Sequence, residues 1–405
     1  MANAGKRSAT VEGDRSEQVE QHIMATRLAS LDAYRGFVMM ALAIDGYFPK
    51  IAQKFPENSF LQRLGRQFVH VPWEGGVFWD LIQPSFMFIV GVAIAYSYHS
   101  RRAKSENSGS IAAHVIYRTL VLIGLGFLLI SMPYQQTNFE FTDILSQIGL
   151  AYPFAYLLVG RMPRVQLTAA AIILLTYWLA FYMYPLPSPN FDYSSLGIHH
   201  DGARFDGLYA HWNRYTNFGT AFDRWFLNLF PRSRIFLYDP LNLATLNFVP
   251  SIVTLLFGTM AGELLRGPRQ PFDKFLKLCA SGLTCVLLGL VLGYTVCPII
   301  KAIWTPSWVL VSAGFTFLLL AAFYWITDIK GSKRVMFPLV VVGMNSLAMY
   351  LMIRLCRDWL WKTVEIHLYI FRDFKYIWPI EAATVTFAMW LVCFWMYRRR
   401  IFIRL

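Results

Sequence analysis

The chain has 405 residues, of which 56% are hydrophobic and only 15% are charged. Soluble globular proteins carry about a quarter charged residues, so this composition excludes a soluble globular chain and indicates an integral membrane protein. The formal net charge is +13, but the long apolar runs leave no solvated basic domain, and we therefore exclude nucleic acid as a partner.

The first 26 residues differ in character from the rest of the chain. Residues 1–26 are polar and of mixed charge, and the first apolar run after them is followed by no small-residue cleavage site. This pattern is not typical of a secretory signal peptide. We predict that 1–26 form a disordered cytoplasmic tail and that 27–405 form one membrane domain.

Apolar stretches follow one another through that domain. A membrane-spanning helix needs about 20 apolar residues, and this criterion predicts an all-α fold, a polytopic bundle of about ten transmembrane helices. The predicted spans are 34–53, 77–98, 113–132, 143–160, 165–184, 247–265, 276–297, 308–327, 336–355 and 376–397.

Lysine and arginine are concentrated in alternate connections between these spans and in the terminal segments. After the first span they are Arg101, Arg102, Lys104, Arg161, Arg164, Arg266, Arg269, Lys274, Lys277, Lys330, Lys333, Arg334, Arg398, Arg399 and Arg400. Because positively charged loops stay in the cytoplasm, we expect both termini and these loops on the cytoplasmic side. Most of the positive charge is thus a topology signal.

The connection 185–246 lies on the opposite side in this topology and is far longer than a typical loop. Loops of that length in a compact domain are usually functional. Its histidines and several of its aromatic residues are His199, His200, His211, Trp212, Tyr215 and Trp225. We predict a partly ordered, lid-like extracytoplasmic loop.

Five cysteines are scattered along the second half of the chain without the spacing of a metal site. We therefore predict no bound metal. The pattern leaves open a bridge between Cys297 and Cys356, which the topology places on the same membrane face.

Charged residues within the predicted spans are functional candidates, because each costs several kcal/mol in the bilayer. They are Arg35, Asp45, Asp80, Arg118, Glu263, Arg354 and Glu381. Long side chains near a span end can extend to the interface. The acids Asp45, Asp80 and Glu381 reach less far, and they need a partner or a wet cavity.

The densest set of chemical groups surrounds the start of the second span, from His70 to Phe86. Pro72 and the glycines at 75 and 76 interrupt the approach to the helix, so His70 is expected in a loop at the outer membrane face. Asp80 follows within the first helical turns. An imidazole beside a buried carboxylate is the pairing that a general base needs, because the acid fixes its tautomer and orientation.

Six segments occur in the order found in a known family. They are 27–36 (RLASLDAYRG), the set His70, Trp73, Gly75, Asp80, Leu81, Pro84, Phe86, Phe88 and Gly91, then 143–152 (DILSQIGLAY), 238–262 with its Tyr-Asp-Pro start, 301–304 and 343–346 (GMNS). Together they resemble the catalytic domain of the heparan-alpha-glucosaminide N-acetyltransferase family and its bacterial relatives, over nearly the whole chain from residue 27.

The resemblance implies a membrane acyltransferase that moves an acyl group, expected to be acetyl, from cytosolic acetyl-CoA to an extracytoplasmic sugar or glycan acceptor. It carries the family's histidine onto His70. Because the bacterial relatives are closer, it also implies a bacterial cytoplasmic (inner) membrane location and an unassigned acceptor. The chain departs from the family at Asp45, where an asparagine is expected, and at Arg354, where a histidine often stands.

Roles can be assigned on this basis. We expect His70, oriented by Asp80, to take a proton from the acceptor as the acceptor attacks the thioester, and a covalent acyl-histidine route is also open. Donors for the oxyanion are Asn345, Gln147 and the Trp73 indole.

Binding roles fall to a second set of residues. The substrate-binding candidates are Trp73, Glu74, Asp45, Gln147 and Asp239. Arg35 and Arg118 are expected to bind the phosphates of acetyl-CoA, because guanidinium groups pair well with phosphate.

Two rival functions have support in the sequence. Intramembrane acids and the proline-broken second span would suit a secondary transporter of a small polar solute, although no internal repeat is present. Asp45 in place of asparagine keeps open a non-catalytic protein that binds a glycan or lipid. The expected partners are the lipid bilayer and a saccharide acceptor, and the sequence leaves open a homodimer.

Overall fold

The computed structural model describes residues 28–44, 59–188, 205–371 and 377–403, together with positions 49, 53, 55, 56, 191 and 192. The predicted tail 1–26, the candidate Asp45 and the loop histidines His199 and His200 lie outside the described residues. The described residues are predominantly helical and form no strand longer than an isolated bridge. The predicted all-α fold is confirmed.

Among the described residues, seven helices are long and apolar enough to cross a bilayer by length and composition. Their bounds are α5 (Ile82–Ala103), α6 (Ser108–Ser131), α8 (Pro163–Tyr182), α10 (Phe248–Arg266), α11 (Pro271–Thr295), α12 (Pro306–Tyr324) and α16 (Ile377–Arg398). A short 3-10 turn, η1 (Phe78–Leu81), leads into α5. The protein is therefore a multi-pass membrane protein.

The predicted count of ten spans is not confirmed. Helices α13 (Lys333–Met344) and α14 (Ser346–Leu355) form one broken unit with a 68° bend, which raises the number of candidate spans in the described chain to eight. Helices α2 (Ala29–Ala43) and α7 (Ile144–Leu158) have 15 residues each. At a rise of 1.5 Å per residue they measure about 22 Å, less than the ~30 Å hydrocarbon core.

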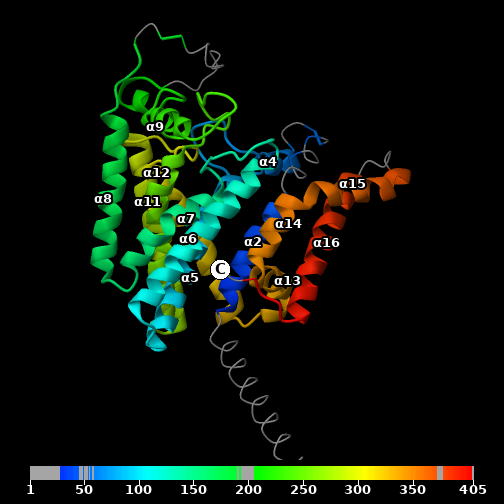
Figure 1. The fold of residues 1–405 in the computed structure, drawn as a ribbon. Coiled ribbons are helices and arrows are strands. Elements are labelled where there is room, and N and C mark those ends of the chain that lie inside the picture. The colour runs from blue at the N-terminus through cyan, green and yellow to red at the C-terminus, as the bar shows by residue number, and fades with distance from the viewer. Residues whose placement is uncertain are drawn as a thin grey trace, which may run out of the picture.

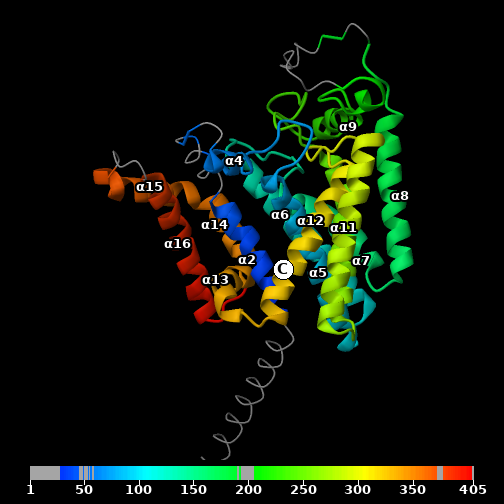
Figure 2. The same cartoon turned by 180° about the vertical axis from the view of Figure 1, so that it is seen from behind.

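The helices form two groups, which Figures 1 and 2 show side by side. The larger group contains α5 to α8 and α10 to α12, and the smaller one contains α13, α14 and α16. Helix α2 packs on α13 and also contacts α5 and α12, so it joins the groups. Glycines permit the closest approaches: a Cβ on Gly343 would overlap the carbonyl oxygen of Asp32, and one on Gly258 would overlap that of Phe88.

The bundle has two chemically different ends. The end where α5, α10 and α16 finish and α8, α11 and α13 begin is called the basic end, because it carries the arginines and lysines of the alternate connections. The opposite end carries α4 (Phe60–Arg66), residues 205–247 with α9 (Phe218–Phe226), and α15 (Arg357–Leu368), which lie in the upper part of Figure 1.

The described part of the long loop is ordered against the opposite end. Trp212 is buried with Trp73, Tyr177 and Cys297 in a separate hydrophobic cluster, and the hydroxyl of Tyr177 donates to the Ile303 carbonyl. All five cysteines belong to the described chain and are free. The bridge between Cys297 and Cys356 that the sequence left open is thus not formed, since Cys297 is enclosed in this cluster.

Candidate functional site

His70 and Asp80 are in direct contact at the opposite end of the bundle. The Nδ1 atom of His70 lies 2.6 Å from Oδ1 of Asp80. The segment between them folds back on itself, since the Trp79 amide donates to the Gln67 carbonyl and the Val77 amide donates to Oδ2 of Asp80 at 3.1 Å. The sequence prediction brought these two residues together, and the structure pairs them.

Lys301 completes this arrangement, and sequence reasoning gave it no role. Its Nζ atom lies 3.1 Å from Oδ1 of Asp80 and 3.1 Å from Nδ1 of His70. The three side chains differ in exposure: 55% for His70, 15% for Lys301 and 1% for Asp80. The buried carboxylate thus has two cationic or donating partners, and the imidazole is the member that faces outward.

The contacts determine which imidazole nitrogen can act as a base. A protonated lysine can only donate, so Lys301 cannot accept a hydrogen bond from Nδ1 of His70. We assign the proton to Nδ1, donating to Asp80 across the 2.6 Å contact, because a carboxylate is the stronger acceptor. Nε2 of His70 then carries the lone pair. The tautomer is assigned from the hydrogen-bond network.

Backbone contacts hold the two contributing loops together. The Gly75 amide donates to the Ile299 carbonyl at 2.8 Å, and Glu74 and Gly75 form bridges to Ile300. Gly75 has a φ of +100°, a conformation that favours glycine. The loop with His70 is therefore fixed to the loop that begins at Cys297 and carries Lys301.

Trp73 and Glu74 lie in the loop with His70 but differ in their surroundings. Trp73 is 3% exposed, and its indole donates to the Trp212 carbonyl at 3.1 Å. Its N–H is thus engaged and does not face an oxyanion at His70, which corrects the expectation that it is a donor. The side chain of Glu74 is exposed.

The amides of Asn345 and Gln147 bind main-chain atoms. Asn345 lies at the break between α13 and α14, and it donates to the Ile401 carbonyl and accepts from the Ile403 amide. Gln147 donates to the carbonyls of Phe141 and Thr245. A polar amide within a span satisfies backbone groups that a broken helix or a loop leaves free, and this explains both positions.

Asp239 is also occupied by backbone contacts. Its Oδ1 accepts hydrogen bonds from the amides of Leu241 and Leu243 at 2.8 and 3.1 Å. Burial raises the pKa of Asp239 above its ordinary value, although these two hydrogen bonds act to lower it. This geometry closes a turn in the long loop. Asp45, the remaining substrate-binding candidate, lies outside the described residues.

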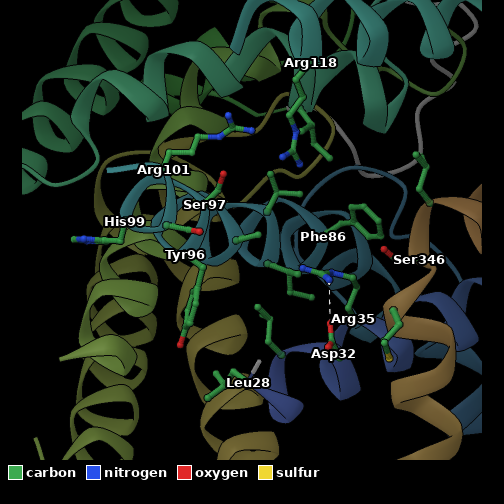
Figure 3. A pocket seen from close by; sticks show the side chains of 18 of the residues that line it. Leu28, Asp32, Arg35, Phe86, Tyr96, Ser97, His99, Arg101, Arg118 and Ser346 are labelled. Atoms are coloured by element: carbon green, nitrogen blue, oxygen red, sulfur yellow. Dashed lines mark hydrogen bonds and ion pairs between the residues drawn. The ribbon is translucent and has the colours of Figure 1, made fainter. Parts of the chain in front are cut away.

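A cavity of about 1020 Å³ lies toward the basic end. Both predicted phosphate-binding residues, Arg35 and Arg118, line it, as Figure 3 shows. Arg35 pairs with Asp32 at 3.2 Å. The Arg118 guanidinium lies 4.6 Å from the Tyr152 ring centroid, and its buried Nε atom has no hydrogen-bond partner in the described chain.

Other cationic and imidazole side chains add to the cavity wall. They are His99, Arg101, Lys104, His114 and Arg266. This donor set fits an elongated ligand with several phosphates, because phosphate oxygens accept from fixed guanidinium forks. The orphaned Nε of Arg118 is the specific observation in favour of such a ligand. Among the described residues, no group of three or more His, Cys, Asp or Glu side chains could hold a metal ion.

Helix α5 connects the cavity with the histidine cluster. Its residues line the cavity from Phe86 to Ala103, a distance of about 26 Å at 1.5 Å per residue. Asp80 lies six residues before Phe86, which is about 9 Å further along the same axis. The cavity therefore extends from the basic end toward the base without reaching it.

Comparison with known proteins agrees with the motifs. No family model matches the chain. The chain is 24% identical over 375 residues to heparan-alpha-glucosaminide N-acetyltransferase from Mus musculus and, likewise, to the protein of that name from Homo sapiens. The match covers 80% of this chain but 53% and 52% of the two relatives, so the chain spans about half their length. The predicted resemblance is confirmed as a distant relationship.

Proposed function

We propose that this distant relative of the heparan-alpha-glucosaminide N-acetyltransferases is a membrane acetyltransferase of a bacterial inner membrane. It would bind acetyl-CoA in the cavity at the basic end and transfer the acetyl group to an amine or hydroxyl of a sugar at the opposite end. The observation that carries the proposal is the course of α5, which lines the basic cavity and, through η1, leads to Asp80 beside His70.

The chemistry supplied by the donor is a thioester carbonyl open to nucleophilic attack. Nε2 of His70 takes the proton from the acceptor nitrogen or oxygen as the new bond to the acyl carbon forms. The carbon–sulfur bond breaks, and the imidazolium returns the proton to the leaving thiolate. Asp80 orients the imidazole through Nδ1 and balances its charge, while Lys301 keeps Asp80 in the ionised form.

The cavity residues have a binding role in this proposal. Arg118, with its unpartnered Nε, and Arg35 would bind phosphate groups near the basic end. The apolar residues Phe86, Ile89 and Ile148 line the cavity in addition, and they suit the uncharged arm of the donor. The same route would also serve an acyl-histidine intermediate, in which Nε2 attacks the thioester first.

A transfer assay tests the proposal directly. Purified full-length protein in lipid nanodiscs is incubated with radiolabelled acetyl-CoA and glucosamine, and labelled N-acetylglucosamine is measured. We expect His70→Ala to reduce transfer by about 10²-fold or more. His367→Ala on α15 is the matched control, because His367 is exposed. Full turnover by the His70 variant would contradict the assignment.

One observation favours a second function, transport of a small polar solute. The broken unit of α13 and α14 bends by 68° at Asn345, and interrupted helices form the substrate sites of many transporters. Sealed vesicles that contain the protein and labelled glucosamine separate the two functions. Accumulation of unmodified sugar without acetyl-CoA would support transport, whereas label transfer would support the acetyltransferase.

A further inference from the structure

Arg214 lies beside the loop that carries the base. The guanidinium carbon of Arg214 is 5.3 Å from the centroid of the Trp73 ring. Two of its nitrogens, Nε and Nη2, are buried and have no hydrogen-bond partner in the described part of the chain. Burial lowers the pKa of Arg214 below its ordinary value, although an arginine stays protonated at neutral pH.

Side-chain hydrogen bonds hold the backbone around Arg214 in place. The side chain of Asn213 makes two hydrogen bonds with the main chain of Phe205, at 2.7 and 2.9 Å, and Asn217 donates to the Asn213 carbonyl at 2.8 Å. Trp73 is held in turn by its bond to the Trp212 carbonyl. The Trp73 ring and the backbone of Arg214 are therefore held in a fixed arrangement.

Two acids in the described part of the same loop have other partners. Asp223 accepts from the Thr245 amide, and Asp239 accepts from two amides of its own turn. Among the described residues, no ion pair joins Arg214 to any acid within 4 Å. A buried charge is normally paired, and the contact with an aromatic ring replaces only part of that pairing. An anionic ligand would give both nitrogens an acceptor.

We propose that Arg214 binds an anionic group of the acceptor, a carboxylate, sulfate or phosphate on the sugar that His70 acylates. The guanidinium fork matches two oxygens of such a group. Trp73 connects the two positions, because its ring stacks under Arg214 and it lies three residues after His70. This inference rests on the proposed acetyl transfer and narrows its acceptor to acidic sugars.

Three kinds of anionic group could bind the guanidinium of Arg214. Carboxylate, sulfate and phosphate share two oxygens at the spacing of a guanidinium fork, but they differ in charge and in the number of acceptor oxygens. The test therefore needs four acceptors: glucosamine, glucosamine 6-sulfate, glucosamine 6-phosphate and a glucosamine linked to glucuronic acid. The acceptor with the highest kcat/KM identifies the group.

Transfer kinetics with the full-length protein in nanodiscs provide the first measurement. We expect at least one acidic acceptor to exceed glucosamine in kcat/KM by about tenfold or more, the effect of a charge-assisted bidentate contact. Arg214→Gln should reduce that ratio to near one, and Arg214→Lys should restore only part of it. Arg234→Gln is the matched control, since Arg234 is an exposed arginine of the same loop, and it should leave the ratio unchanged.

Two outcomes would overturn the inference. One is equal kcat/KM for acidic and neutral acceptors in the unaltered protein. The other is a loss in Arg214→Gln that affects all acceptors by the same factor, which would indicate a structural role. Each variant is checked by size-exclusion chromatography so that a folding defect is recognised. If Arg214→Gln is misfolded, the ratio of kcat/KM for acidic and neutral acceptors in Arg214→Lys decides between the anion site and a structural role.

A binding measurement separates failure of this inference from failure of the acetyltransferase proposal. The His70→Ala protein is titrated with glucosamine and glucosamine 6-sulfate, and the fluorescence of its tryptophans is followed. Tighter binding of the sulfated sugar that is lost in His70→Ala combined with Arg214→Gln would support the anion site even if no transfer occurs. Equal affinity for both sugars would refute it even if His70 proves to be the base.

Discussion

Polar groups toward the two ends of the bundle are in opposite states of pairing. At the opposite end, Asp80 is in contact with both His70 and Lys301, and the charges balance within the protein. At the basic end, Arg118 faces a cavity of about 1020 Å³ with a nitrogen that has no hydrogen-bond partner in the described chain. The first arrangement is complete before a ligand arrives, and the second requires one.

This difference separates two kinds of kinetic effect. A preorganised base acts on the chemical step, so changes around His70 should lower kcat. Cations that contact a ligand equally in the ground and transition states act on binding, so changes in the cavity should raise KM. A variant near His70 that raises KM alone, or a cavity variant that lowers kcat alone, would contradict this distinction.

The largest effect is expected from Asp80→Asn. The amide keeps the size of the carboxylate but removes its charge, so it no longer fixes the Nδ1 proton of His70 or pairs with Lys301. We expect kcat to fall by about 10²- to 10⁴-fold, as happens when the acid that orients a catalytic histidine is removed.

The control for this variant is Asp358→Asn, whose carboxylate is 93% exposed on α15. Size-exclusion chromatography shows whether both proteins fold. A folded Asp80→Asn protein with kcat within a few-fold of the unaltered protein would exclude Asp80 from orienting the base.

The next effect is expected in the cavity, from Arg118→Gln. Loss of a charged partner for a phosphate should raise the KM for acetyl-CoA by about 10- to 100-fold, with a smaller change in kcat. Arg164→Gln, an exposed arginine at the same end, controls for the change in overall charge. A lower kcat with unchanged KM would place Arg118 in the chemical step and contradict its assignment to binding.

Lys301→Met should have a smaller effect, confined to kcat. The methionine fills most of the volume of the lysine but leaves Asp80 with His70 as its one remaining side-chain partner among the described residues. We expect kcat to fall by about tenfold, with the KM for acetyl-CoA unchanged. Lys362→Met, an exposed position on α15, is the control. A rise in KM without loss of kcat would show that Lys301 acts on binding.

The residues of the histidine cluster were not equally predictable. His70 and Asp80 are ten positions apart in one stretch, and the proline and glycines between them indicate a turn that can bring them together. Lys301 is 231 positions from His70, and the pairing depends on a loop-to-loop contact between Gly75 and Ile299. No local pattern in the sequence reports such a contact.

Residues elsewhere in the chain also differed in how visible they were in the sequence. Arg35 and Arg118 could be selected because a charge within an apolar run is costly and therefore conspicuous. Arg214 gave no such signal, since an arginine in a polar loop is ordinary, and its exceptional property is a pair of buried nitrogens with no hydrogen-bond partner in the described chain. Asn345 also interrupts an apolar run, but its partners are main-chain atoms of the C-terminal segment, which spacing along the sequence does not predict.

The smallest effect concerns stability rather than turnover, and it comes from Asp223 in the ordered part of the long loop. This carboxyl is 2% exposed and accepts from the Thr245 amide at 3.0 Å. Burial raises its pKa from the ordinary 3.8 to about 7. Between those two values the unfolded chain releases a proton that the folded chain retains, so the free energy of unfolding falls as pH rises from about 4 to 7.

Asp223→Asn removes this dependence, because the amide has no proton to lose in that range and its oxygen still accepts from Thr245. We expect the midpoint of thermal unfolding to be similar for both proteins near pH 4 and a few degrees higher for the variant at pH 8, with acetyl transfer unaffected because Asp223 contacts none of the three residues at the base. A variant less stable than the unaltered protein at pH 8 would indicate that the ionised carboxylate of Asp223 stabilises the loop. The opposite end of the bundle would then contain a stabilising negative charge in addition to that of Asp80, which Lys301 balances.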